Sequence, residues 1–303
     1  MSKKSIQNLF IILLSVYLVG CSSLASRKAI SESEYFIPET LNPPIGSMYT
    51  IEEEHARGMV ALAQIRNDPD VICIEDRRII EYVTGLVRDL ISHVPTDVPR
   101  VPISIYIINS QDSFSSRAVT IIGGSIFLQI KSLAQSASED FLATQLSHEI
   151  GHVFLRHPGR WESQRTYFSD YMEKRRAASD IDPRIPPITA GDLQQFELYL
   201  INRILISEDE ADIFSVQLAV ASGYDPHEYM RDLAEKNSFP GFMVFLNHHR
   251  SGHERAALME QEFQNSKARS SSNRRRASQK SSKQFKRVRE VARGIVRTQI
   301  HIQ

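Results

Sequence analysis

The chain has 303 residues, of which 42% are hydrophobic and 24% are charged, and its formal net charge is zero. This composition excludes a chain that is disordered throughout, and the length leaves room for one large domain or two small ones. The two cysteines, Cys21 and Cys73, are too few for a disulfide framework.

Charge is distributed unevenly along the chain. Residues 21–263 contain 22 basic and 35 acidic residues, whereas residues 264–303 contain 12 basic residues and one acid, Glu290. An acidic body therefore precedes a strongly basic tail, and the two parts are interpreted separately.

The N-terminal residues have the pattern of a secretion signal. Lys3 and Lys4 precede an apolar run, Leu9–Val19, which is too short to span a bilayer. The run ends in Leu18-Val19-Gly20-Cys21, which looks like a bacterial lipobox with Cys21 as the lipidation site. An ordinary signal sequence with a chance cysteine is the alternative.

The lipobox predicts a signal peptide over residues 1–20 and a tether over residues 21–47. Ser22 follows the cysteine, and by resemblance to lipoprotein sorting signals it indicates transport to the outer membrane. We therefore expect a protein that is lipid-anchored to the bacterial outer membrane and faces the periplasm.

The remaining pattern is rich in helices and contains a few short strands. Ser136 is a candidate N-cap, with Glu139 three residues later to close a capping box. Periodicity and turn residues predict helices over 51–64, 76–92, 136–156 and 192–223, another helix after Asp225, and strands over 103–108, 118–122 and 125–130. The predicted fold class is α+β, with a small sheet.

One predicted helix carries His148-Glu149-Ile150-Gly151-His152, an H-E-x-x-H pattern. Residues four apart lie on one face of a helix, so the two imidazoles can bind one zinc ion. Glu149 lies one step around the helix, where it can act as a base on water activated by the metal. A chance match on an amphipathic helix is the alternative.

The next long helix contains four acids within Glu208-Asp209-Glu210-Ala211-Asp212. A catalytic zinc site needs a third protein ligand, and Glu208 could supply it. Asp212 shares its face and could accept a hydrogen bond from a ligand histidine, which would fix the tautomer of that histidine. A solvated acidic face is the alternative interpretation.

Several ordered pieces of the chain resemble the zinc metallopeptidase family that includes the CAAX prenyl proteases, HtpX, BepA and LoiP. The likeness covers roughly residues 51–259. The pieces are Gly123-Gly124-Ser125-Ile126-Phe127, His148-Glu149-Ile150-Gly151-His152-Val153, Glu208-Asp209-Glu210-Ala211-Asp212, Gly223-Tyr224-Asp225-Pro226, and His249 six residues before Arg255.

The resemblance implies a zincin-like (gluzincin) metallopeptidase domain over residues 48–263 with one Zn²⁺ per subunit. The implied metal ligands are His148, His152 and Glu208, and the implied catalytic residues include Glu149 and Asp212.

The chain departs from the family pattern at two places. His249 matches a family histidine near the metal and is a further candidate catalytic residue, but Arg250 stands where the family usually has proline. A surface histidine is the alternative there. Arg117-Ala118-Val119-Thr120 replaces the frequent Asn-Ala-Phe-Ala, which concerns substrate preference.

The resemblance implies a zinc metalloendopeptidase that hydrolyses misfolded envelope proteins in outer-membrane quality control. The strand after Gly124 is expected to hold peptide substrates by β-augmentation. The alternative is an envelope assembly factor or holdase with largely structural zinc and latent proteolysis, in which residues 158–207 cover the cleft.

The basic tail, residues 264–303, has two parts. Residues 270–276 are predicted to be disordered, and from Gln284 the residues Phe285, Val288, Ala292 and Ile295 fall on one helical face. A basic amphipathic helix suits an anionic membrane surface. Nucleic acid is the alternative partner by charge, although an exported lipoprotein would seldom meet it, and a solvated extension without a partner is the third interpretation.

Overall fold

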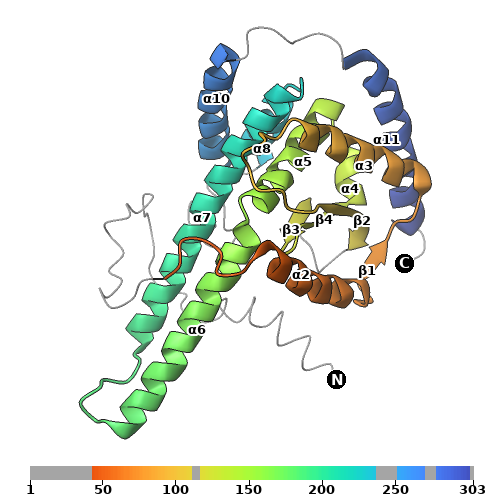
Figure 1. The fold of residues 1–303 in the computed structure, drawn as a ribbon. Helices are drawn as coiled ribbons and strands as arrows, with labels where there is room; N and C mark the ends of the chain where they lie inside the picture. The colour runs from red at the N-terminus through yellow and green to blue at the C-terminus, as the bar shows by residue number, and fades with distance from the viewer. Residues whose placement is uncertain (1–42, 111–116, 237–250, 270–277, 301–303) are drawn as a thin grey trace.

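Four strands form one small sheet in the order β1-β2-β4-β3 (Figure 1). The structure is a computed structural model that describes residues 43–110, 117–236, 251–269 and 278–300. The strands are β1 (Val71–Cys73), β2 (Ser104–Ser110), β3 (Ala118–Ile121) and β4 (Ser125–Gln129). The helices are α2 (Ile51–Arg66), α3 (Arg77–Ser92), α4 (Ile130–Gln135), α5 (Glu139–Phe154), α6 (His157–Ile181), α7 (Ala190–Ala221), α8 (His227–Lys236), α10 (Gly252–Arg269) and α11 (Ser278–Ile300). The predicted helix-rich α+β class is confirmed.

Strand β4 lies inside the sheet, parallel to β2 on one side and antiparallel to β3 on the other. Both sides of β4 are therefore occupied by ladder hydrogen bonds. The prediction that the strand after Gly124 receives a peptide by β-augmentation is wrong for this reason. Among the described residues, β3 pairs only with β4 and is an edge of the sheet.

The turn between β3 and β4 depends on two glycines. Gly123 and Gly124 have φ angles of 84° and 85°, which disfavour any side chain. A Cβ atom on Gly123 would also lie 2.6 Å from the carbonyl oxygen of Glu54, and one on Gly58 would lie 2.2 Å from that of Ile122. Helix α2 therefore packs directly against the backbone of this hairpin.

Helix α5 runs through the centre of the molecule and is buried along almost its entire length. Leu142, Leu146 and Ile150 belong to the main hydrophobic core together with side chains of α3, α4 and β4. Polar groups on such a helix lose their water, so each requires a protein partner or a ligand.

The single helix predicted over residues 136–156 is two helices. Ser138 is the N-cap of α5 and its hydroxyl accepts a hydrogen bond from Phe141 N at 3.1 Å. Ser136 instead ends α4, and its hydroxyl donates to the carbonyl of Ser132. At the other end α5 stops at Phe154, and Arg156 adopts a left-handed conformation with φ 58° before α6 begins.

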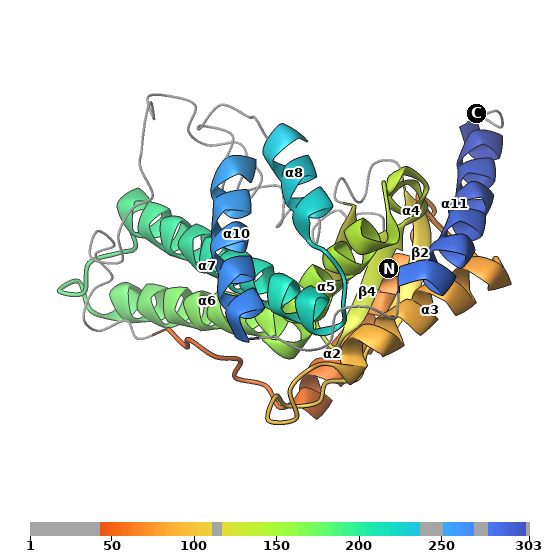
Figure 2. The same ribbon diagram turned by 90° about the horizontal axis from the view of Figure 1, so that it is seen from above.

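Helices α6 and α7 form a long antiparallel hairpin (Figure 1). Its outer part extends away from the sheet and α5, whereas α11 lies at the opposite end of the molecule (Figure 2). The hairpin is held by its own aromatic cluster around Phe168 and Phe196. The outer part of residues 158–207 therefore projects from the body. Trp161, near the start of α6, instead lies against His152 of α5, with 5.6 Å between the ring centroids. The covering role considered from the sequence stays a prediction.

The predicted amphipathic helix of the tail is present as α11, but its apolar face is buried. Phe285, Val288 and Ala292 belong to the main core, and Arg289 and Arg293 donate to backbone carbonyls at the end of α4. That face is therefore unavailable for insertion into a membrane. None of the described helices is long and apolar enough to cross a bilayer.

Candidate metal centre

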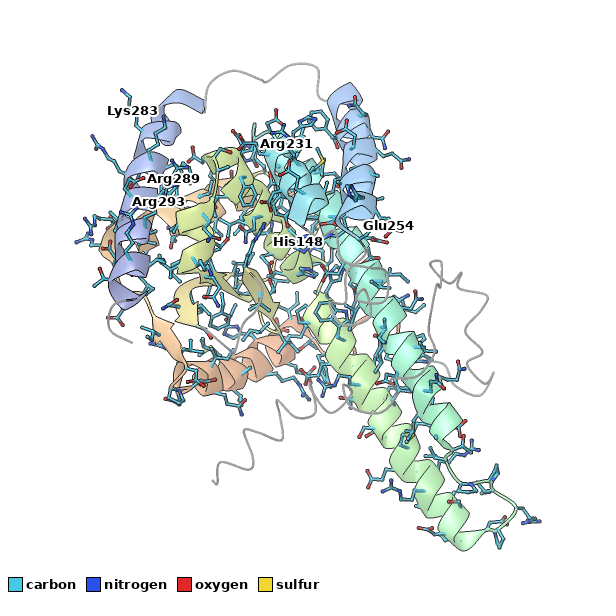
Figure 3. All side chains as sticks on the ribbon, turned by 180° about the vertical axis from the view of Figure 1, so that it is seen from behind. His148, Arg231, Glu254, Lys283, Arg289 and Arg293 are labelled. Atoms are coloured by element: carbon cyan, nitrogen blue, oxygen red, sulfur yellow. The ribbon has the colours of Figure 1, made fainter. Side chains whose placement is uncertain are left out.

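Two imidazoles of α5 and one carboxylate of α7 meet in the interior. His148 Nε2 and His152 Nε2 are 3.1 Å apart, and each lies 3.3 Å from an oxygen of Glu208. All three residues are buried, and His148 lies at the middle of the body (Figure 3). The spacing of four residues on α5 and the packing of α5 against α7 together produce this convergence.

The two imidazoles and the carboxylate fit a zinc ion. Nitrogen and oxygen ligands about 2.0–2.1 Å from a tetrahedral zinc lie about 3.3 Å from one another. The two Nε2 atoms are 3.1 Å apart, and each lies 3.3 Å from a different oxygen of the Glu208 carboxylate, which is close to this spacing. Two histidines and one carboxylate also leave a fourth position, as a catalytic zinc site requires. His148, His152 and Glu208 could therefore hold the metal.

The site attracts positive charge. Burial lowers the pKa of His148, but the carboxylates of Asp212 and Glu208 outweigh it and raise that pKa well above its ordinary value. An environment that favours a proton on the imidazole also favours a metal cation in its place, and binding of the metal would displace the proton.

Asp212 connects the first imidazole to a buried arginine. Its Oδ1 atom lies 2.9 Å from His148 Nδ1, and both of its oxygens accept hydrogen bonds of 2.7 Å from Arg255 of α10. Burial raises the pKa of Asp212, but the charge of Arg255 prevails and lowers it to about 2. Asp212 is thus an anion facing Nδ1, which places the proton of His148 there and the lone pair on Nε2.

A second set of contacts fixes which nitrogen of His152 carries its proton. His152 Nδ1 lies 2.8 Å from His157 Nδ1, and His157 Nε2 lies 2.9 Å from Glu210 Oε2. The hydrogen bond from His157 lowers the pKa of Glu210, and burial lowers the pKa of His157. A neutral His157 therefore donates from Nε2 to Glu210.

The proton on His157 Nε2 determines the tautomer of the next ring. Because Nδ1 of a neutral His157 then carries a lone pair, it accepts a hydrogen bond from His152 Nδ1. The lone pair of His152 is left on Nε2, the atom that faces His148 and Glu208. Both imidazoles thus present the nitrogen that a metal needs.

Glu149 is positioned by the edge strand. The hydroxyl of Thr120 in β3 donates hydrogen bonds to Glu149 Oε2 at 2.7 Å and to the Glu149 carbonyl at 3.2 Å. The side chain of Glu149 is buried. The carboxylate and the sheet edge are therefore physically linked, which the sequence did not indicate.

The structure brings His148, Glu149, His152, Glu208 and Asp212 into one buried region. Glu208 and Asp212 are buried, so the solvated acidic face weighed as an alternative is wrong for these two positions. The candidate catalytic residue His249 and the candidate lipidation site Cys21 lie outside the described residues.

Three residues support the centre in a way that the sequence did not indicate, although Arg255 and Thr120 belong to stretches compared with the family pattern. Arg255, His157 and Thr120 contact Asp212, His152 and Glu149 respectively; each is distant in sequence from its partner except His157.

Comparison with known proteins supports the resemblance inferred from the motifs. No protein-family model matches the chain. The beta-barrel assembly-enhancing protease of Escherichia coli (strain K12) is 26% identical over 224 residues, which is 70% of this chain and 44% of that protein. The Yersinia pestis protein of the same name is 23% identical over 237 residues, covering 75% of this chain and 47% of that protein.

A third relative gives the same result. The putative beta-barrel assembly-enhancing protease of Vibrio cholerae is 25% identical over 214 residues, which is 68% of this chain and 42% of that protein. The chain thus spans less than half the length of these relatives. Their names confirm the predicted resemblance to the family that includes BepA.

Proposed function

Because the chain is similar to beta-barrel assembly-enhancing proteases, we propose that it is a zinc-dependent metalloendopeptidase. One observation carries the proposal: two imidazole nitrogens and a carboxylate, from helices distant in sequence, lie 3.1–3.3 Å from one another. His148, His152 and Glu208 would be the ligands of one zinc ion.

The chemistry proposed is hydrolysis of a peptide bond. Bound zinc would supply Lewis-acid activation of a water molecule and of the scissile carbonyl. Glu149 would take the proton of the attacking water and deliver it to the leaving amine. The hydrogen bond from Thr120 would hold the Glu149 carboxylate in the orientation for this transfer.

The substrate would bind as an extended strand beside β3. This strand is an edge of the described sheet, and it carries Thr120, which touches the proposed base. An edge strand offers backbone hydrogen-bonding groups to a peptide, so binding depends only weakly on the side chains of the peptide. Such recognition suits unfolded segments of many proteins.

Misfolded proteins of the bacterial envelope are the proposed substrates, with a role in outer-membrane quality control. The names of the relatives and the lipobox ending in Cys21 support this assignment. We propose that the chain is anchored at the outer membrane and faces the periplasm. In fractionated cells the Cys21→Ser form should then be soluble, and unchanged membrane association would contradict the anchor.

A second candidate function is an assembly factor or holdase with latent proteolysis. The observation that favours it is burial: the side chains of His148, Glu149, His152 and Glu208 are each at most 7% exposed. A peptide could reach them only after a local opening. In this alternative the zinc is mainly structural.

Cleavage of casein by the purified protein separates the two candidates. The wild type should cleave casein and lose this activity with a chelator. Glu149→Gln should retain zinc and lose about 10²–10⁴-fold in rate, the contribution typical of general acid–base catalysis. Glu173→Gln, an exposed position on α6, is the matched control and should behave as wild type. Cleavage that survives both the chelator and Glu149→Gln would refute the peptidase proposal.

A further inference from the structure

Helix α11 carries a row of five cations along one flank. Lys283, Lys286, Arg289, Arg293 and Arg297 follow one another at intervals of three or four residues. On a helix this spacing places them in a line, which we call the cationic stripe. Figure 3 shows Lys283, Arg289 and Arg293 in succession along α11.

The core of the molecule fixes the orientation of the cationic stripe. Phe285, Val288 and Ala292 bury the adjacent face of α11. Arg289 Nη1 donates to the carbonyls of Ser136 and Ala137, at 3.0 and 2.8 Å. The helix cannot rotate about its axis without breaking these contacts, so the stripe is a rigid feature of the surface.

The members of the stripe differ in what they already bind. Arg293 donates to the Ala134 carbonyl at 3.0 Å and to Glu290 at 2.6 Å, and Glu290 is the only acid of α11. Lys283, Lys286 and Arg297 are exposed. Three cations of the stripe therefore face solvent with little neutralisation from their own helix.

An open hollow lies beside the C-terminal half of the stripe. Its volume is about 580 Å³, and Lys131, Ala134, Gln135, Arg293, Val296 and Arg297 line it. Lys131 comes from α4, so two helices contribute positive charge to one concave surface. Three cations and the apolar side chains of Ala134 and Val296 line one hollow, which suits an anionic headgroup that carries phosphate and is attached to hydrocarbon.

We propose that the cationic stripe and this hollow bind the phosphate-bearing surface of an anionic lipid bilayer. Charge complementarity identifies the partner as a polyanion, and the lipobox ending in Cys21 favours a membrane over nucleic acid. The buried apolar face excludes the insertion expected of an amphipathic helix, so the contact is electrostatic. The proposal does not depend on peptidase activity.

Sedimentation with vesicles tests the proposal on the full chain carrying Cys21→Ser, in which lipid attachment is blocked. Vesicles of phosphatidylcholine with about one third phosphatidylglycerol are compared with phosphatidylcholine alone. Since each cation near the surface contributes roughly a factor of five, Lys286→Gln with Arg297→Gln should weaken binding about 30-fold. These two substitutions leave Arg289 and Arg293, which hold α11 on α4, in place.

The matched control removes two exposed cations at the other end of the molecule. Lys174→Gln with Arg176→Gln, on α6, makes the same change in net charge and should alter binding less than twofold. KCl at about 0.5 M should abolish binding by screening. Millimolar inorganic phosphate should not displace the vesicles, because the attraction comes from many phosphates at once.

Three outcomes would overturn the proposal. Equal binding to neutral and anionic vesicles would show that the contact is not electrostatic. Equal losses in the stripe variant and in the α6 control would show that only net charge matters. Tighter binding of a short DNA duplex than of anionic vesicles at the same salt concentration would assign the stripe to nucleic acid.

Discussion

The metal centre on α5 and α7 and the C-terminal helix α11 both carry several charged side chains, and the two regions use charge in opposite ways. In the metal centre the charged groups are buried, and contacts at specific atoms fix their states, as with Asp212 between His148 and Arg255. On α11 the apolar face is buried, and several cations face solvent. Burial therefore determines whether charged groups form a binding site with specific partners or an exposed charged surface.

The largest effect is expected when a buried charge loses its partner. Arg255→Leu leaves the Asp212 carboxylate buried without its two guanidinium hydrogen bonds, and should cost about 3–5 kcal/mol in the free energy of unfolding. Arg78 makes the same paired contact with Asp76 at the surface, where its side chain is 68% exposed. Arg78→Leu should cost less than about 1 kcal/mol. Urea unfolding of the two variants measures the difference in the free energy of unfolding. Equal losses would show that burial does not set the contribution of these ion pairs.

On α11 we expect stability to depend on a buried apolar side chain and not on the exposed charge beside it. Phe285 is 3% exposed in the main core, so Phe285→Ala should cost about 3–5 kcal/mol in the free energy of unfolding. Its neighbour Lys286 is exposed, and Lys286→Gln should change that free energy by less than about 0.5 kcal/mol. If thermal and urea unfolding found Phe285→Ala neutral, α11 would be an extension that contributes nothing to the core.

The smallest effect concerns the support of a ligand. His157→Gln should disturb the hydrogen bond that keeps the His152 lone pair on Nε2, and should weaken zinc binding about 10–100-fold. Competition with a chromophoric chelator measures the affinity independently of cleavage. His93→Gln, at an exposed histidine after α3, is the control. Unchanged zinc affinity in His157→Gln would show that His157 does not position the His152 imidazole for the metal.

The sequence predicts the residues that would hold the metal better than it predicts the residues that support them. Helical periodicity alone places His148 and His152 on one face of their helix, because they are four residues apart. It places Glu208 and Asp212 on one face in the same way. The partner of Asp212 could not be found by periodicity. Arg255 belongs to α10, and only the packing of α10 against α7 brings it to the site.

His157 was missed for a different physical reason. On an unbroken helix, a residue five positions after His152 would lie about 140° away around the axis. The left-handed conformation of Arg156 ends α5 and turns the chain, which returns His157 to His152. A positive φ angle at an arginine has no clear sequence signal, although the predicted helix over 136–156 also ends there.

The tail shows a limit of amphipathic patterns. Phe285, Val288 and Ala292 were correctly placed on one face, but periodicity does not reveal what covers that face. A membrane and a protein core satisfy the same pattern. The packing of α11 on α3, α4 and α5 shows that the core covers this face, so a partner of α11 would have to bind its exposed, basic side.

The most direct test of the central claim is the position of zinc in crystals of the purified protein, located by anomalous scattering at the zinc edge. We expect one peak about 2.0–2.2 Å from His148 Nε2, His152 Nε2 and a Glu208 oxygen. A peak elsewhere, or a protein that cleaves casein with no zinc at this position, would contradict it.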